Sequence, residues 1–203
     1  MAMPPQDPQP EYALLARMKQ GDEQAFVQLY RRHRDAVYRF ALLYCGSPAT
    51  AADVTQDTFV HFIAHPQQFD PARGTVGAWL CGIARNMARR HSGLREDATD
   101  PAELSDDQAP RDGHVDHDTP LEGVLRAESA EAVRRAIAAI APHYRDVLIL
   151  CELSELSYAE AAQVCGIDIG TVRSRLSRAR AQLAQRLAPY AANGHAAAKE
   201  AVQ

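Results

Sequence analysis

Apolar residues recur at helical spacing along most of this chain, which places them on one face of an α-helix. In the first half the spacing predicts four helices, over Glu11 to Lys19, from Asp22 to Gly46, from Thr50 to His65 and from Thr75 to Arg90. Asp22, Thr50 with Asp53, and Thr75 are expected to cap the last three of these helices. No segment alternates apolar and polar residues as a half-buried strand does.

The apolar stripes of these helices predict the core of the first half. Their members are Phe26, Leu29, Tyr30, His33, Val37, Phe40, Ala41, Tyr44, Val54, Phe59, Phe62, Ile63, Val76, Trp79, Leu80, Ile83, Ala84 and Met87. Trp79 lies on the stripe of the fourth helix, which favours core packing over base stacking. Arg85, Arg89 and Arg90 lie off that stripe and are expected to face outward.

The second half repeats the helical spacing after a change of composition. Thr119, Pro120 and Glu122 form a helix start, and the helix is expected to run to Ile140 and to end before Pro142. A helix from His143 to Leu153 follows. The alanine-rich end after Pro189 is expected to be frayed.

A helix-turn-helix is predicted next. Ser157 and Glu160 have capping-box spacing, Gly166 ends the first helix, and Asp168 starts the second. On the second helix Val172, Leu176, Ala179, Leu183 and Leu187 form the packing stripe, which leaves Gly170, Ser174, Ser177 and Arg178 on the other side. No acidic residue lies between Val172 and Leu187, so this face suits DNA. The alternative is a solvated, arginine-rich surface helix.

The charge is unevenly distributed. The net charge is −4, but nine acidic residues lie between Glu96 and Asp118 with Arg111 as the only basic one, and the remainder is net positive. This polar stretch cannot form a core and predicts a flexible linker. The sequence therefore predicts an all-α fold with two small helical domains joined by an acidic linker. The expected parts are a disordered start (1–10), a first domain (11–93), the linker (94–119), a second domain (120–189) and a frayed tail (190–203).

Several function classes find no support in the sequence. No apolar run approaches the ~20 residues needed to span a bilayer, and the start lacks a signal sequence, so a cytoplasmic protein without membrane insertion is expected. Cys45, Cys81, Cys151 and Cys165 have no paired spacing and are expected to be buried thiols. His114 and His117 among acidic residues are a weak metal signal. We expect no metal, cofactor or catalytic constellation.

Short segments in both halves of the chain carry a family resemblance. In the second half they are Ala141 to Leu148, Leu156 to Tyr158 and Gly170 to Arg180, and in the first half Asp53 to Phe59, Ala78 to Leu80 and Ile83 to Asn86. Together they resemble the extracytoplasmic-function (ECF) sigma factors of bacterial RNA polymerase. The resemblance implies a promoter-specificity subunit that binds core polymerase at its clamp coiled coil and flap, recognises two promoter elements and helps to melt the duplex. An anti-sigma factor is a further partner that the resemblance allows.

The resemblance also implies roles for particular residues. Asp53, Gln56 and Asp57 correspond to the helix that docks on the clamp, although from the residues alone Asp53 would be a cap and Asp57 a solvated charge. The residues that correspond to the family's contacts with the minus-ten element and its melted strand are Arg73, Arg85, Asn86, Arg89 and Arg90. The residues that correspond to the family's contacts with the minus-thirty-five duplex are Arg173, Ser174, Arg175, Ser177, Arg178 and Arg180. Of these, Arg175 and Arg180 are expected to contact phosphates.

Some positions depart from the family pattern. Glu155 stands where glycine is frequent, Asp168 where proline or serine is frequent, and Cys165 replaces a larger aliphatic residue. The acidic linker is open to two readings, a mimic of RNA charge or an extended spacer. The alternative function is a stand-alone helix-turn-helix regulator of duplex DNA, which leaves the first half unexplained.

Overall fold

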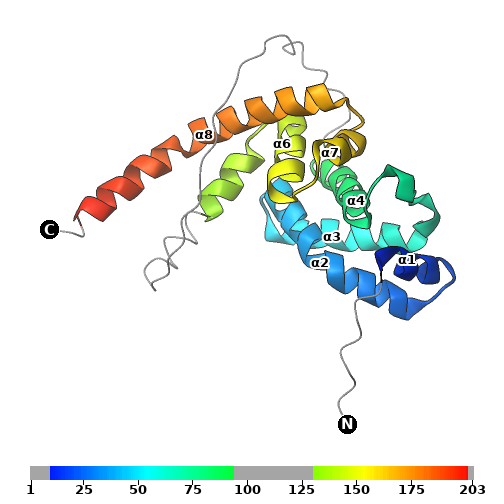
Figure 1. The fold of residues 1–203 in the computed structure, drawn as a ribbon. Helices are drawn as coiled ribbons and strands as arrows, with labels where there is room; N and C mark the ends of the chain where they lie inside the picture. Colours follow the sequence, from blue (N-terminus) through cyan, green and yellow to red (C-terminus); the bar gives the residue numbers. More distant parts are fainter. Residues whose placement is uncertain (1–9, 94–129, 201–203) are drawn as a thin grey trace.

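The computed structural model describes residues 10–93 and 130–200, with only the backbone path given for Pro189 and for 191–200. The expectations for the N-terminal segment, the acidic linker, His114, His117 and the helix start at Thr119 concern residues outside these ranges. In the described part all regular structure is helical and no strand occurs, which confirms the all-α fold. Figure 1 shows the helices in two groups that pack together.

The first domain contains the four predicted helices. They are α1 (Glu11–Lys19), α2 (Glu23–Cys45), α3 (Pro48–Ala64) and α4 (Val76–His91), with short 3₁₀ turns η1 (Pro66–Gln68) and η2 (Pro71–Arg73) between α3 and α4. Asp22 accepts hydrogen bonds from the N–H groups of Gln24 and Ala25, and Thr75 accepts one from Ala78, so both predicted caps are confirmed. Gly46 ends α2 with a left-handed φ of 70°.

The start of α3 differs from the sequence prediction. Ser47 caps the helix by accepting a hydrogen bond from the N–H of Thr50, and Pro48 takes the first helical position. Proline fits there because its missing N–H would have no partner in the helix. Thr50 and Asp53 therefore lie inside the helix, and the prediction that they cap it is wrong.

The second domain begins, in the described range, with a helical segment at 130–138. The further elements are α6 (Pro142–Leu148), a π-helical turn η3 (Ile149–Leu153), α7 (Tyr158–Cys165) and α8 (Ile169–Glu200). Sequence periodicity predicts α6 and η3 as one helix, but the N–H of Ser154 bonds to the carbonyl of Ile149 and widens the last turn. α8 continues through Pro189, which corrects the expected frayed end, since the alanine-rich flanks favour helix strongly.

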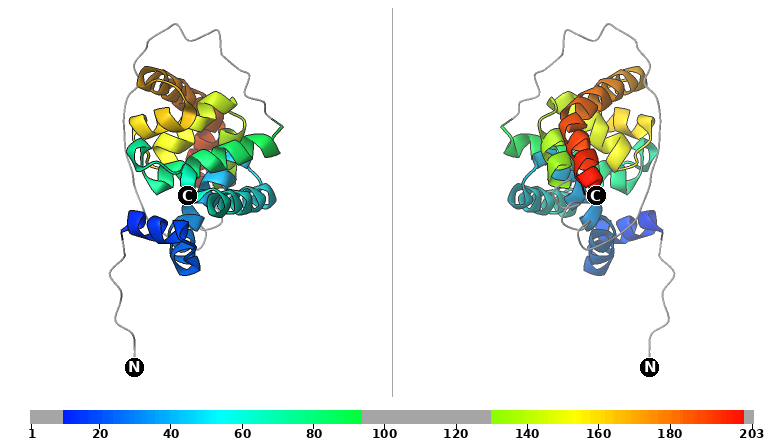
Figure 2. Two further views of the ribbon diagram at one scale, coloured as in Figure 1. Left: turned by 90° about the vertical axis from the view of Figure 1, so that its right-hand side faces the viewer. Right: turned by 90° about the vertical axis from the view of Figure 1, so that its left-hand side faces the viewer.

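The core joins both domains. Phe40, Tyr44, Phe62 and Leu80 are buried in the first domain, and Ile137, Ile149, Leu150 and Leu176 in the second, within one apolar cluster. Ile63, expected on the core stripe of α3, is 49% exposed, because helical geometry places it about 100° around the helix from the buried Phe62 and so beside the core face. Figure 2 shows, from both sides, the helices of the second domain stacked on those of the first.

Candidate nucleic-acid interface

The helix-turn-helix is fixed by hydrogen bonds at each of its ends. Ser157 Oγ accepts a bond from the N–H of Glu160, and the Glu160 carboxylate accepts one from the N–H of Ser157, which confirms the capping box. Gly166 ends α7 with a φ of 68°. Asp168 then starts α8 by accepting a bond from the N–H of Thr171 at 2.9 Å, so the turn between the helices has a defined geometry.

The recognition helix α8 buries one face and leaves the other accessible. Val172, Leu176 and Ala179 are buried, as the stripe predicts, and α8 packs on α6 and α7. Arg173 is exposed, with its guanidinium carbon 6.0 Å from the centre of the Tyr158 ring. Ser174, Arg175 and Ser177 are half-buried at the edges of that face. The face therefore offers short hydroxyl groups with arginines around them.

Two arginines of this helix already have partners within the domain. The guanidinium of Arg178 donates to the Tyr144 hydroxyl at 3.4 Å and is half-buried, so its expected position opposite the packing stripe is wrong. Helical periodicity places Arg178 next to Ala179, at the border of the stripe, where α6 reaches it. Arg180 is exposed and forms an ion pair with Glu152, which raises the pKa of Arg180. A DNA contact by either residue would replace these bonds.

The predicted docking residues lie on the outer face of α3. Asp53, Gln56 and Asp57 are all exposed at helical spacing. Asp57 Oδ2 is 2.9 Å from Nε2 of His91, which comes from the end of α4. A groove beside Gln56 is lined by apolar and aromatic side chains of α2 and α3, and Val60 at its edge is 56% exposed. The surface thus combines carboxylates with apolar area.

The predicted minus-ten residues divide into two groups. Arg73, Asn86 and Arg90 are exposed, and Arg89 is half-buried. Arg85 is buried, with Nε donating to Asp146 Oδ2 at 2.7 Å, so the prediction that it faces outward is wrong. Burial lowers the pKa of Arg85, but the Asp146 carboxylate and other acidic groups outweigh it and the net direction is upward. Sequence reasoning missed Asp146, because residues 61 positions apart carry no local signal of contact.

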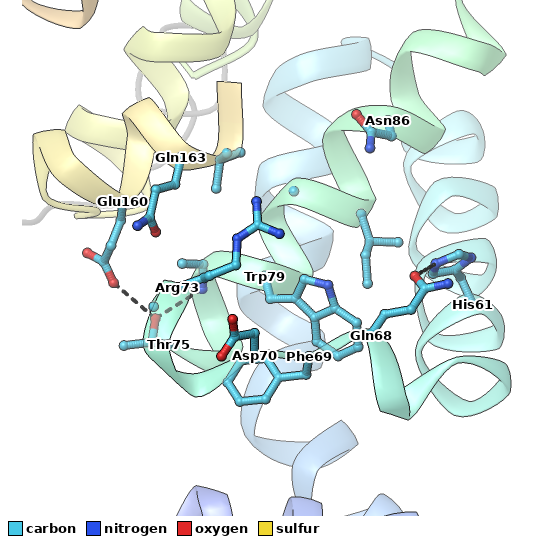
Figure 3. A pocket seen from close by; sticks show the side chains of 15 residues that line it. His61, Gln68, Phe69, Asp70, Arg73, Thr75, Trp79, Asn86, Glu160 and Gln163 are labelled. Carbon is cyan, nitrogen blue, oxygen red and sulfur yellow. Dashed lines mark hydrogen bonds between the residues drawn. The ribbon is translucent and has the colours of Figure 1, made fainter. Parts of the chain in front are cut away.

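A cavity of about 290 Å³ lies between α4 and α7, drawn in Figure 3. Trp79 lines it and packs against the rings of Phe62 and Phe69 at centroid distances of 5.5 and 5.4 Å, which confirms core packing. Glu160 and Gln163 of α7 face Arg73 and Thr75 across the cavity (Figure 3). Nothing in the sequence indicates that α7 residues complete this cavity.

The four cysteines are free thiols, and burial raises the pKa of each of them. Cys81 is buried, while Cys45, Cys151 and Cys165 are half-buried, so the expected burial is complete for one of them. Desolvation raises the pKa of Cys81 and Cys151 to about 11 and that of Cys165 to about 12. Among the residues whose side chains the structure describes, no three metal-ligating side chains are grouped. Within residues 10–93 and 130–200, no helix has the length and apolarity that a membrane span requires.

The comparisons with known proteins identify the family. Sigma-70 region 2 matches residues 29–95, and Sigma-70 region 4 matches residues 130–183. The chain is 33% identical over 169 residues to the ECF RNA polymerase sigma factor SigC of Mycobacterium tuberculosis. The aligned residues cover 83% of this chain and 86% of that protein. The chain therefore belongs to the sigma-70 family. Within that family it belongs to the ECF RNA polymerase sigma factors.

Solved structures resemble both domains. CnrH, in complex with the cytosolic domain of CnrY, has a TM-score of 0.66 and 27% identity over 90% of this chain and 99% of that one. The sigma factor RpoE, in complex with the anti-sigma factor NepR from Bartonella quintana, has a TM-score of 0.56 and 26% identity over 80% and 96%. The chain spans 62% and 64% of the length of two further curated relatives, each 33% identical to it.

Proposed function

We propose that this chain is a promoter-specificity subunit that binds core RNA polymerase, recognises the minus-thirty-five and minus-ten elements and directs initiation. The observation that carries the proposal is that regions 2 and 4 match in order on two helical domains, the second with a capped helix-turn-helix. The chain has no catalytic chemistry of its own in this proposal. Its place of action is the cytoplasm, where polymerase works.

In this proposal α3 docks on the clamp coiled coil of the polymerase. Carboxylates and an amide on one exposed face accept charge-assisted hydrogen bonds from basic residues, which orients a partner as well as holding it. The Asp57 carboxylate contacts His91 in the free protein and would exchange that contact for a polymerase cation. The second domain contacts the flap of the polymerase in the same proposal.

The promoter contacts divide between the two domains. Arg73, Asn86, Arg89 and Arg90 are accessible to phosphates and unpaired bases of the melted minus-ten strand, and Arg85 joins them once its bond to Asp146 is broken. On α8, Arg173, Ser174, Ser177 and Arg178 read base edges, whereas Arg175 and Arg180 lie at the flanks and hold phosphates. An anti-sigma factor is proposed as an inhibitory partner, because RpoE is bound by NepR.

A stand-alone helix-turn-helix regulator is the competing function. It would use only the second domain, usually as a dimer, and would bind an operator tightly without polymerase. A stand-alone regulator would give no role to the exposed carboxylates of α3.

Transcription in vitro with purified core polymerase, the full chain and genomic fragments tests the proposal. Core polymerase alone and core with the chain are compared, and the start sites are mapped. We expect new, discrete start sites that depend on the chain, with shared elements about ten and thirty-five base pairs upstream. Specific DNA binding that needs no polymerase, with no chain-dependent transcript, would instead support the regulator.

A further inference from the structure

An aromatic stack leads from the cavity to the surface of α1. Trp79 of α4 packs against Phe69 at a centroid distance of 5.4 Å, and Phe69 packs against Tyr12 of α1 at 6.1 Å. The planes of the Phe69 and Tyr12 rings are inclined by only 30°, so these two rings are stacked. Tyr12 is therefore the outer ring of the stack.

Exposure rises along this stack. Phe69 is 5% exposed, whereas Tyr12 is 50% exposed. Because Phe69 lies against one face of the Tyr12 ring, most of the accessible area lies on the other side. A ring that is supported from behind and open in front can accept a second flat ring without moving.

The attachment of α1 to the domain does not depend on the Tyr12 ring. Leu14, Leu15 and Met18 are buried in the apolar core, and α1 packs on α2. Helical geometry places Tyr12 beside this buried stripe rather than on it. Substitution of Tyr12 should thus leave α1 in place.

The stack borders the surface proposed for the melted minus-ten strand. Phe69 and Trp79 line the cavity of about 290 Å³ together with Arg73 and Asn86 (Figure 3). α1 contacts η1, which directly precedes Phe69, and Figure 1 shows α1 beside the segment that joins α3 and α4. Tyr12 therefore extends the proposed surface from α4 and this segment onto α1.

A flat ring beside a cation suits an unpaired base. Proteins that bind single strands combine cationic groups for the phosphates with aromatic side chains on which the bases stack. Arg73 is exposed and offers the cation, and Tyr12 offers the ring. In duplex DNA each base is stacked on its neighbours, so its faces reach a side chain only after the strands separate. A contact of this kind favours melted over paired DNA, because it exists in only one of the two states.

We propose that Tyr12 stacks on one unpaired base of the melted promoter strand, next to the bases held at the cavity, and thereby stabilises the open over the closed promoter complex. The inference rests on the proposed sigma function. It adds a residue outside the segment that Sigma-70 region 2 matches, which begins at residue 29. Every base has a flat face, so the contact supports melting without requiring a particular base.

Promoter opening by holoenzyme assembled from core polymerase and the full chain tests the inference. The template is a promoter whose start site has been mapped with the wild type. Tyr12→Ala should lower the equilibrium ratio of open to closed complex by about 5- to 150-fold, the range expected for loss of one base–aromatic stack. Affinity for core polymerase and for the closed duplex should not change.

Three further variants separate the flat ring from its bulk. Tyr12→Phe keeps the ring and should open the promoter like the wild type, whereas Tyr12→Leu covers Phe69 without a ring and should behave like Tyr12→Ala. Tyr190→Ala is the matched control, because Tyr190 of α8 is also 50% exposed. Circular dichroism and the emission of Trp79, the only tryptophan of the chain, show whether each variant keeps its fold.

A fluorescent base locates the contact. 2-Aminopurine, an adenine analogue whose emission is quenched by stacking, replaces one base at a time in a template with a premelted minus-ten region. One position should stay quenched with the wild type and Tyr12→Phe, and brighten with Tyr12→Ala and Tyr12→Leu. Affinity for this template should fall by the same factor as the opening ratio, because the base is already unpaired before the holoenzyme binds.

The outcomes distinguish this inference from the proposed function. Equal opening by the wild type and Tyr12→Ala, with no position that brightens, overturns the stacking contact while the proposed function stands. Wild-type opening by Tyr12→Leu overturns it too, since the ring would then act only by packing on Phe69. Weakened core binding by folded Tyr12→Ala would assign the ring to the polymerase instead. If the wild type directs no transcription, the proposed function fails and the contact fails with it.

Discussion

At the scale of single residues, backbone geometry and charge pairing act at identifiable positions. Glu155 has a φ of 54°, in the left-handed region where a side chain clashes with the backbone. It follows the π-helical turn and precedes α7, so the chain reverses direction there. A φ in this region favours glycine, so the geometry suits the residue that the family pattern led us to expect at this position.

Glu155→Gly should stabilise the protein slightly. Removing the left-handed penalty gains about 1–2 kcal/mol, and the larger freedom of glycine in the unfolded chain offsets about 0.4–1 kcal/mol. We expect the free energy of unfolding to rise by about 0.5 kcal/mol, measured from urea denaturation. Glu155→Ala keeps a Cβ and should give no such rise. Equal effects of the two substitutions would show that φ is not the cause.

Arg178→Ala should flatten the preference of the protein within the minus-thirty-five element. The guanidinium reaches a base edge from the border of the accessible face, and a bidentate contact to guanine discriminates by about 1–3 kcal/mol. Arg180→Ala should weaken binding evenly, because its contact is to phosphate. Transcription by both variants on a panel of single-base promoter changes separates the roles. A uniform loss for Arg178→Ala would assign base reading to Arg173, Ser174 and Ser177.

The burial of a side chain was predictable from the sequence only where it depends on the position of the residue on its own helix. The buried positions Val172, Leu176 and Ala179 follow from periodicity. The burial of Arg85 does not, because it depends on a carboxylate from the other domain. Periodicity reports which face of a helix is apolar, but a long cationic side chain at the edge is placed by its partner.

At the scale of elements, α3 serves two surfaces at once. Val54, Phe59 and Phe62 pack into the core, whereas Asp53, Gln56 and Asp57 are exposed on the opposite side. A substitution on the exposed side therefore changes recognition without removing core contacts.

Asp57→Arg should weaken binding to core polymerase at least about tenfold, since it places a cation against the cations that the carboxylate is proposed to meet. Gln56→Ala should have a milder effect. Affinity measured by fluorescence anisotropy, with circular dichroism to confirm folding, tests this. Glu155→Arg is the matched charge reversal in the second domain. Unchanged affinity in folded Asp57→Arg would remove α3 from the docking surface.

Element boundaries were predictable where a side chain satisfies a local backbone group. Asp22, Thr75 and Ser157 act as caps where the sequence places them. The first turn of α3 was misassigned because Ser47 and Thr50 both suit a cap, and Pro48 fits the first helical position only when Ser47 is the cap. The continuation of α8 through Pro189 was missed because a local rule about proline outweighed the helix propensity of its flanks.

At the scale of the whole molecule, the distribution of charge matters as much as its sum. The net charge of −4 arises from the acidic stretch between Glu96 and Asp118, while the domains on either side of it are together net positive. A tethered acidic segment competes with DNA phosphates for the same cationic side chains and repels the duplex. The isolated protein should therefore bind a promoter duplex poorly at physiological salt.

Replacing the nine acidic residues of this stretch by Asn, Gln and Ser should strengthen duplex binding by the isolated protein, because the net charge becomes positive. The gain should be larger at low salt, since phosphate contacts release counterions and weaken as salt rises. Titration of a minus-thirty-five duplex at several salt concentrations measures both effects. The control shuffles the stretch and keeps its charge, and it should bind like the wild type. Equal affinity and equal salt dependence of the neutralised and wild-type proteins would show that the acidic stretch is only a spacer.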